Sequence, residues 1–112
     1  MRLSERLMTI AGFVSRGAKI ADIGTDHGYL PVYLMEKKIT RSAIASDISP
    51  GSLDKIISYV KEHKLEHSID TRLGDGLDVI KPYEVDTVII AGMGGLLIQE
   101  ILEKNTRTRD SI

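Results

Sequence analysis

The chain has 112 residues, a formal net charge of −1 and no cysteine, with 42% hydrophobic and 28% charged residues. This length predicts one small domain with the composition of an ordinary globular protein. The lack of cysteine excludes a disulfide framework and a thiolate metal site. No apolar run reaches the ~18 residues that a membrane span needs, and the near-neutral charge gives no global argument for nucleic-acid binding. We therefore expect a cytoplasmic protein without a membrane segment.

The spacing of apolar residues alternates between helical and strand periods along the chain. Residues 3–16 have helical spacing, with Gly17 as the predicted C-cap, and an apolar strand follows at 19–23. Beyond it, the pattern predicts helices at 28–38, 50–64 and 96–104, strands at 42–47, 69–73 and 85–91, and a short helical piece at 76–80. Ser49 is the predicted N-cap of the second of these helices, which is expected to bury a stripe that includes Ile57. Because strands alternate with helices, the sequence predicts an α/β fold with a parallel sheet and right-handed crossovers.

The most informative stretch is a glycine-bounded turn directly after the first predicted strand. Gly24 and Gly28 flank a polar segment at a position where open α/β sheets bind nucleotide-like ligands. Asp26 stands where the dinucleotide fingerprint has its middle glycine, which disfavours a nicotinamide-dependent oxidoreductase. Asp22, two residues before the first glycine, completes a pattern that resembles the first motif of class I S-adenosylmethionine methyltransferases.

Two further carboxylates follow the ends of predicted strands. Asp47 ends the second strand and can accept hydrogen bonds from ribose hydroxyls, or it can instead be a turn or N-cap residue before Ser49. Asp75, in a Gly-Asp-Gly turn after the third strand, can accept from the exocyclic amine of adenine, or be an ordinary turn residue. Asp22 is either a partner for the ammonium group of the cofactor or a strand-end cap. His63 and His67 are four residues apart, but no third metal ligand accompanies them, so no metal site is expected.

Taken together, five segments resemble one family, the bacterial tRNA (adenine-N1)-methyltransferases that modify adenine 22 of tRNA. These segments are residues 3–7, 22–31, 44–47, 72–77 and 90–95. The resemblance implies a Rossmann-like class I methyltransferase fold, a three-layer sandwich whose parallel strands have the order 3-2-1-4. It also implies S-adenosyl-L-methionine as cofactor and tRNA as substrate.

The resemblance also implies roles for particular residues. The implied cofactor-binding residues are Asp22, Gly24, Gly28, Asp47, Ile48, Asp75, Gly76, Ala91 and Gly92. Asp26 and His27 are the candidate catalytic residues, with a helix N-cap and a structural hydrogen bonder as the respective alternatives. The strand end at Ala91–Gly92 lacks the side chains with which many amino methyltransferases hold an exocyclic amine, so a pocket lined by backbone is implied there. The alternative is a glycine-rich turn from strand to helix that allows close packing.

Members of this family continue well beyond the length of this chain. We therefore expect residues 1–104 to form the N-terminal part of the cofactor-binding domain, followed by a polar tail at 105–112. In such a truncated chain the strand at 85–91 would have an unpaired outer edge, which predicts self-association through that edge or marginal stability. Two functions remain open beside tRNA methylation: cofactor binding without catalysis, and methylation of a different substrate.

Overall fold

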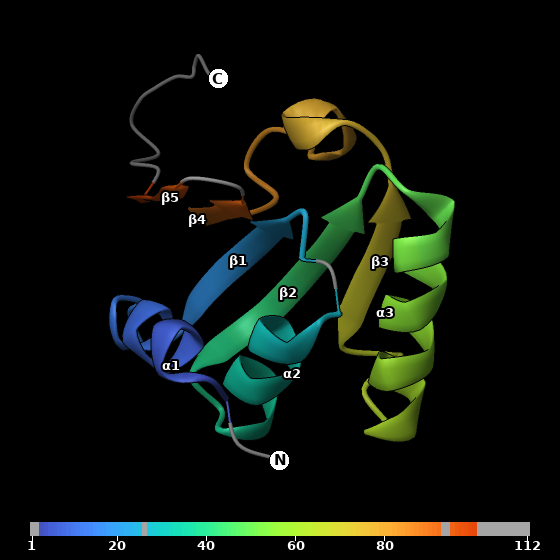
Figure 1. The fold of residues 1–112 in the computed structure, drawn as a ribbon. Helices are drawn as coiled ribbons and strands as arrows, with labels where there is room; N and C mark the ends of the chain where they lie inside the picture. Colours follow the sequence, from blue (N-terminus) through green and yellow to red (C-terminus); the bar gives the residue numbers. More distant parts are fainter. Residues whose placement is uncertain (1–2, 26, 93–94, 101–112) are drawn as a thin grey trace.

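The computed structural model describes residues 3–25, 27–92 and 95–100. Its strands form one five-stranded sheet in the order β3-β2-β1-β4-β5 (Figure 1). The strands are β1 Ala18–Ile23, β2 Thr40–Asp47, β3 Ile69–Leu73, β4 Thr87–Gly92 and β5 Gly95–Glu100. The first four pair in parallel, and β5 pairs antiparallel with β4. The predicted parallel order 3-2-1-4 is therefore confirmed.

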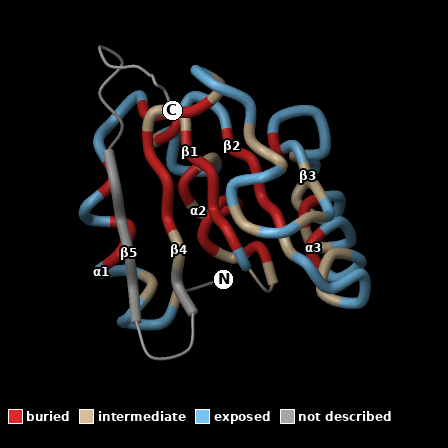
Figure 2. The backbone as a smooth tube through the Cα atoms, turned by 90° about the horizontal axis from the view of Figure 1, so that it is seen from above, coloured by how far each residue is buried: buried red, intermediate tan, exposed pale blue. Residues whose placement is uncertain are grey.

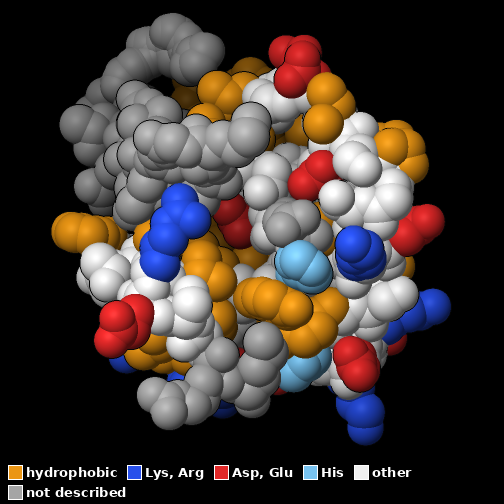
Figure 3. Space-filling view, viewed as in Figure 1, with side chains coloured by type: hydrophobic (Ala, Val, Ile, Leu, Met, Phe, Trp, Pro, Cys, Tyr) orange, Lys and Arg blue, Asp and Glu red, His pale blue; other side chains and the backbone are white. Residues whose placement is uncertain are grey.

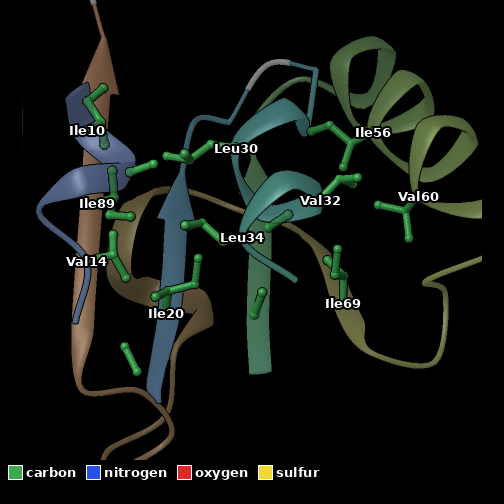
Figure 4. Close-up of a cluster of buried hydrophobic side chains, with 14 residues drawn as sticks. Ile10, Val14, Ile20, Leu30, Val32, Leu34, Ile56, Val60, Ile69 and Ile89 are labelled. Carbon is green, nitrogen blue, oxygen red and sulfur yellow. The ribbon is translucent and has the colours of Figure 1, made fainter. Parts of the chain in front are cut away.

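Three helices cover one face of this sheet (Figure 1). They are α1 Glu5–Gly12, α2 Tyr29–Glu36 and α3 Pro50–Glu62, and a short 3₁₀ helix, η1 Gly76–Val79, follows β3. Figure 4 shows the core that joins the layers, in which Ile10, Leu34 and Ile56 of the three helices meet Ile20 and Ile89 of the sheet. All five of these side chains are 0–1% exposed. Because successive strand residues point to opposite faces, Asp22 points to the same side as Ile20, toward the helices.

The opposite face of the sheet carries a smaller apolar cluster under the loop from η1 to β4. Ala21, Ile44 and Val88 of the strands meet Val85 of the loop there. Arg72 of β3 fastens this loop, because its guanidinium donates to the Glu84 carboxylate and to the Val79 carbonyl. Figure 2 shows that buried residues run along β1, β2 and β4, whereas β3 and the outer side of α3 are more exposed.

The ends of the helices follow local chemistry, and two predictions about them need correction. Ser49 caps α3 as predicted, because its hydroxyl accepts from the Ser52 amide at 3.3 Å. The first helix ends at Gly12 rather than at 16, and Phe13 is its C-cap. Gly17 instead has φ +87° in the turn into β1, where its amide donates to the Ile39 carbonyl at 2.7 Å. Ile57, predicted to be buried, is 37% exposed because it lies at the edge of the apolar stripe of α3.

The largest correction concerns the segment after β4. The helix predicted at 96–104 is wrong over residues 96–100, which belong to β5 and pair with β4, the register running from Gly92↔Gly95 to Thr87↔Glu100. The three consecutive apolar residues 96–98 fit the helical period and the strand period equally well. The open edge of β4 offers backbone hydrogen-bonding groups to a strand and thereby favours the strand. The outer edge of β4 is thus paired within the chain, and the premise for self-association through 85–91 is wrong. Residues 101–104 of the predicted helix and the tail 105–112 lie outside the described residues.

Candidate functional site

A cleft of about 830 Å³ opens at the carboxyl ends of β1 and β2, between the first turn of α1 and the start of α2. On this face of the molecule acidic, basic and histidine side chains gather around a hollow (Figure 3). The cleft is lined by Ser4, Arg6, Leu7, Asp22, Ile23, Gly24, Thr25, His27, Tyr29, Leu30, Asp47, Ser52 and Ile90. This is the end of a parallel sheet at which α/β proteins bind their ligands.

The two glycines of the β1–α2 turn have different tasks. Gly24 has φ +69°, and a Cβ built there would meet no atom within 4 Å, so its backbone faces open space in the cleft. Gly28 has φ +79° as the N-cap of α2, and a Cβ there would lie 3.3 Å from Cγ2 of Ile56. Gly28 therefore allows α2 to pack closely on α3, whereas Gly24 leaves room for a ligand.

Asp22 lies at the end of β1 with only 3% of its surface exposed. Burial raises the pKa of the Asp22 carboxyl group to about 7, although the nearby Thr25 hydroxyl lowers this pKa in part. The Thr25 hydroxyl forms no hydrogen bond of ordinary geometry with any described residue. No described cation forms an ion pair with Asp22. A buried acid without a cation, in a cleft, is typical of a ligand-binding group because a bound cation would restore its ionised form.

Asp47 combines a structural task with access to the cleft. Its Oδ1 accepts a hydrogen bond from the Ser49 amide at 2.9 Å, which shapes the turn from β2 into α3. Its second carboxylate oxygen, Oδ2, makes no hydrogen bond to the described residues and belongs to a side chain that lines the cleft. The turn role that the sequence offered as an alternative is present, and it leaves one oxygen for a ligand.

His27 and Tyr29 form the wall of the cleft beside α2. The imidazole of His27 stacks on the Tyr29 ring with centroids 4.9 Å apart and planes at 12°, and Tyr29 meets Tyr59 of α3 edge-on at 5.0 Å. This stacking fixes the imidazole ring against α2 while leaving it at the cleft. Asp26, the other candidate catalytic residue, lies outside the described residues.

The remaining candidates lie on the rim or beyond it. Ile48 is 65% exposed just after β2, and Asp75 is exposed before η1, where its side chain caps no backbone amide. Gly76 has φ +56° in the same turn, and neither it nor those two side chains line the cleft. Ala91 and Gly92 are the last two residues of β4.

Sequence reasoning missed the contribution of α1 to the cleft. Ser4, Arg6 and Leu7 line it, although no site residue was predicted in the first helix. No strand-end motif could have found them, because α1 precedes the sheet and reaches the cleft through tertiary packing. Ser52 of α3 and Ile90 of β4 also line the cleft, and neither was predicted as a site residue.

No metal centre and no membrane span emerge from the part of the chain that the structure describes. Within it, no three His, Asp or Glu residues come together as a metal site, and no helix is both long and apolar enough to cross a bilayer. His63 instead lies with Nδ1 2.7 Å from Glu36 Oε2, and His67 is exposed.

The strand order 3-2-1-4, the glycine turn after β1 and the acidic residues at the ends of β1 and β2 define a Rossmann-like α/β protein of the class I methyltransferase type. The family model described as a methyltransferase domain matches residues 3–112. The chain belongs to this methyltransferase family.

Individual relatives and solved structures show which methyltransferases the chain is similar to. The chain is 46% identical over 103 residues to the tRNA (adenine(22)-N(1))-methyltransferase of Bacillus subtilis, which covers 92% of this chain and 43% of that protein. The crystal structure of the B. subtilis M1A22 tRNA methyltransferase TrmK superposes with a TM-score of 0.80 at 44% identity, covering 83% of this chain and 40% of that one. M. capricolum TrmK, solved with S-adenosyl-homocysteine, gives a TM-score of 0.76 at 39% identity, covering 82% of this chain and 42% of that one.

A Streptococcus pneumoniae protein solved in complex with S-adenosyl-L-methionine gives a TM-score of 0.80 at 39% identity, covering 83% of this chain and 44% of that chain. The chain spans 43–49% of the length of the curated relatives that it matches.

Proposed function

We propose that this chain provides the cofactor-binding part of an S-adenosylmethionine-dependent enzyme that methylates N1 of adenine 22 in tRNA. The observation that carries the proposal is the cleft in which Asp22, Gly24 and Asp47 meet, in a chain 46% identical to a tRNA (adenine(22)-N(1))-methyltransferase. Such a substrate is consistent with the cytoplasmic location expected from the sequence.

The residues of the cleft fit S-adenosylmethionine. Asp47 has one carboxylate oxygen left to accept from ribose hydroxyls. Gly24 leaves the turn open to the amino-acid end of the cofactor, and Asp22 is a buried anion suited to its ammonium group. Beyond the cleft, the exposed side chains of Ile48 and Asp75 would lie at the rim beside the adenine of the cofactor.

Bound S-adenosylmethionine supplies a methyl group on a sulfonium, which is activated toward a nucleophile without a metal. N1 of adenine has a lone pair and needs no strong base before attack, so the task of the protein is positioning and electrostatic stabilisation. His27 stands at the cleft wall, where it would help to orient the base. The product is a cationic adenine, and Asp26 would stabilise its positive charge.

Two measurements test this function. Calorimetry should detect binding of S-adenosylhomocysteine and no binding of a nicotinamide dinucleotide. Transfer of a labelled methyl group to unmodified tRNA, with a transcript that carries guanine at position 22 as control, tests the reaction. Binding without transfer would favour the alternative, a cofactor-binding module without catalysis. Transfer to the guanine-22 transcript would favour a different substrate position.

The role proposed for Asp26 has its own test. In an enzyme that contains this domain and is active on tRNA, Asp26→Asn should leave the affinity for S-adenosylhomocysteine unchanged and lower the rate of methyl transfer, because the carboxylate acts on charge that develops on the adenine. Single-turnover methylation measures that rate. Equal rates for variant and parent would leave Asp26 with the role of a helix cap.

A further inference from the structure

The turn between β3 and η1 is held at both of its ends. At its start, the Gly74 amide donates to the Asp47 carbonyl at 3.0 Å, which joins the turn to the end of β2. At its far end, Nη1 of Arg72 donates to the Val79 carbonyl at 2.5 Å. Between these two points, Asp75 is exposed and its side chain caps no backbone amide. The backbone of the turn is therefore fixed on either side, while the Asp75 carboxylate faces solvent.

Arg72 uses every N–H of its guanidinium to hold this region. Nε and Nη2 donate to Oδ2 of Asp70 at 3.1 and 2.7 Å, and Nη1 and Nη2 donate to the two carboxylate oxygens of Glu84 at 2.8 and 2.5 Å. The bond to the Val79 carbonyl engages the remaining N–H. A planar guanidinium with all its donors engaged cannot turn without losing hydrogen bonds, so it fixes the end of η1 relative to β3.

The interior of the turn is tightly packed. A Cβ at Gly74 would lie 1.9 Å from Cγ1 of Val79, so the two ends of the turn are in close contact. Because Arg72 holds the carbonyl of that same valine, loss of the guanidinium would let the end of η1 move away from Gly74. Such a movement would displace Asp75, which lies between the two ends in sequence.

Resting on the proposed function, we propose that Arg72 is a positioning residue that makes the site selective for adenine in its cofactor. Arg72 does not line the cleft, and it acts by keeping the Asp75 carboxylate where it accepts from the exocyclic amine. The same arrangement disfavours hypoxanthine, because an oxo group in place of the amine would present a second acceptor to the carboxylate. Loss of Arg72 would thus remove the preference for adenine while the rest of the cofactor still binds.

Calorimetry with two ligands tests this role. S-adenosylhomocysteine carries the exocyclic amine, and S-inosylhomocysteine carries an oxo group in its place. The unaltered protein should prefer the first by about tenfold. Arg72→Met should weaken S-adenosylhomocysteine binding by about threefold to tenfold and leave S-inosylhomocysteine binding unchanged. Arg41→Met is the matched control, because Arg41 is exposed near the start of β2, at the opposite end of the sheet, and its loss changes the net charge equally.

A double-mutant cycle with Asp75→Ala separates positioning from a general loss of structure. If Arg72 acts through Asp75, Arg72→Met should cause no further loss of S-adenosylhomocysteine affinity in the Asp75→Ala protein. A merely structural role would weaken binding equally in both backgrounds and would overturn the proposal. Glu84→Gln replaces one of the carboxylates that hold Arg72 and should reduce the preference for adenine in part. This milder variant decides the matter if melting curves show that Arg72→Met does not fold, and an unchanged preference in it would then overturn the proposal.

The remaining outcomes distinguish this inference from the proposed function. An unchanged preference in a folded Arg72→Met protein, or equal weakening of both ligands, would overturn the role of Arg72 and leave the proposed function intact. Equal loss of preference in Arg41→Met would show a general charge effect and also overturn it. If the unaltered protein binds both ligands equally, the site does not read the amine, and the inference alone fails. If it binds neither ligand, the cofactor assignment fails and the inference fails with it.

Discussion

Two turns at the carboxyl edge of the sheet have similar sequences and different surroundings. The β1–α2 turn begins after the buried Asp22, whose carboxylate lies in a cleft and forms no ion pair with a described residue. The β3–η1 turn, with Asp75 between two glycines, is exposed, and the loop beyond it is fastened by Arg72. A glycine and an aspartate after a strand therefore do not define a site by themselves. The difference lies in whether neighbouring helices enclose the turn and leave its polar groups unsatisfied.

The first prediction breaks the second turn while leaving the first intact. A Cβ at Gly74 would lie 1.9 Å from Cγ1 of Val79, so the Val79 side chain or the turn between β3 and η1 must shift to accept any side chain. Gly74→Ala should lower the free energy of unfolding by about 3 kcal/mol, at the upper end of overpacking effects. Urea unfolding followed by circular dichroism measures this loss.

Gly51→Ala is the control for that substitution. Gly51 lies in α3, and the nearest atom to a Cβ there is the Ser49 hydroxyl oxygen at 3.8 Å. Alanine at that position should maintain or raise stability, because it favours a helix more than glycine does. Equal stability of the two variants would show that the β3–η1 turn rearranges freely, which would remove the contrast between the turns.

The second prediction compares the two carboxylates as binding groups. Asp47→Ala should weaken binding of S-adenosylhomocysteine by about 1.5–3 kcal/mol, since it removes an ionised acceptor at the cleft. Asp75→Ala should have a smaller effect of about 0.5–1.5 kcal/mol, because water competes at its exposed position. Calorimetry on both variants measures how much binding free energy each substitution removes. A larger effect at Asp75 would mean that enclosure does not distinguish the turns.

The sequence predicted much of this site, and its failures have a physical cause. Strand ends carry local signals, so Asp22, Gly24 and Asp47 were found from glycine and aspartate spacing, and the cleft brings them together. Arg6 was missed because no local pattern reports which helix packs beside a strand end. The helix predicted at 96–104 failed because a short apolar run fits both periods, so its pairing partner, the edge of β4, decided the outcome.

The third prediction uses the pKa of Asp22, which burial raises to about 7 in the folded chain from its ordinary value of 3.8. The folded state holds this proton more tightly than the unfolded state, so its contribution to stability is full below pH ~4 and is lost as pH rises through 7. Thr25, His27, Asp47 and Arg6 line the cleft around it.

The variant that isolates this effect is Asp22→Asn. The melting temperature of the parent should fall relative to that of the variant between pH 5 and pH 8, and the difference between the two proteins removes the contributions that they share. In the same range, S-adenosylhomocysteine should bind the parent more tightly as Asp22 ionises. Parallel melting curves across this range would place the pKa of Asp22 near its ordinary value and remove the argument for a cationic ligand group.

The smallest expected effect lies in the loop that follows the second turn. The Arg72 guanidinium lowers the pKa of Glu84 to about 2 from its ordinary value of 4.5, and the Lys81 amide also donates to that carboxylate at 2.8 Å. The resulting stability is present above pH ~4.5 and is lost as the pH falls through 2.

Because the Glu84 side chain is 27% exposed, solvent screens its ion pair with Arg72, and Glu84→Gln should lower the free energy of unfolding at pH 7 by only about 0.5–1 kcal/mol. Urea unfolding at pH 7 and pH 3 measures it, and the gap between parent and variant should narrow at pH 3. Asp78→Asn, an exposed carboxylate in η1, is the control and should change neither value. A gap that is as wide at pH 3 as at pH 7 would mean that the stability lost in Glu84→Gln does not come from the ionised pair.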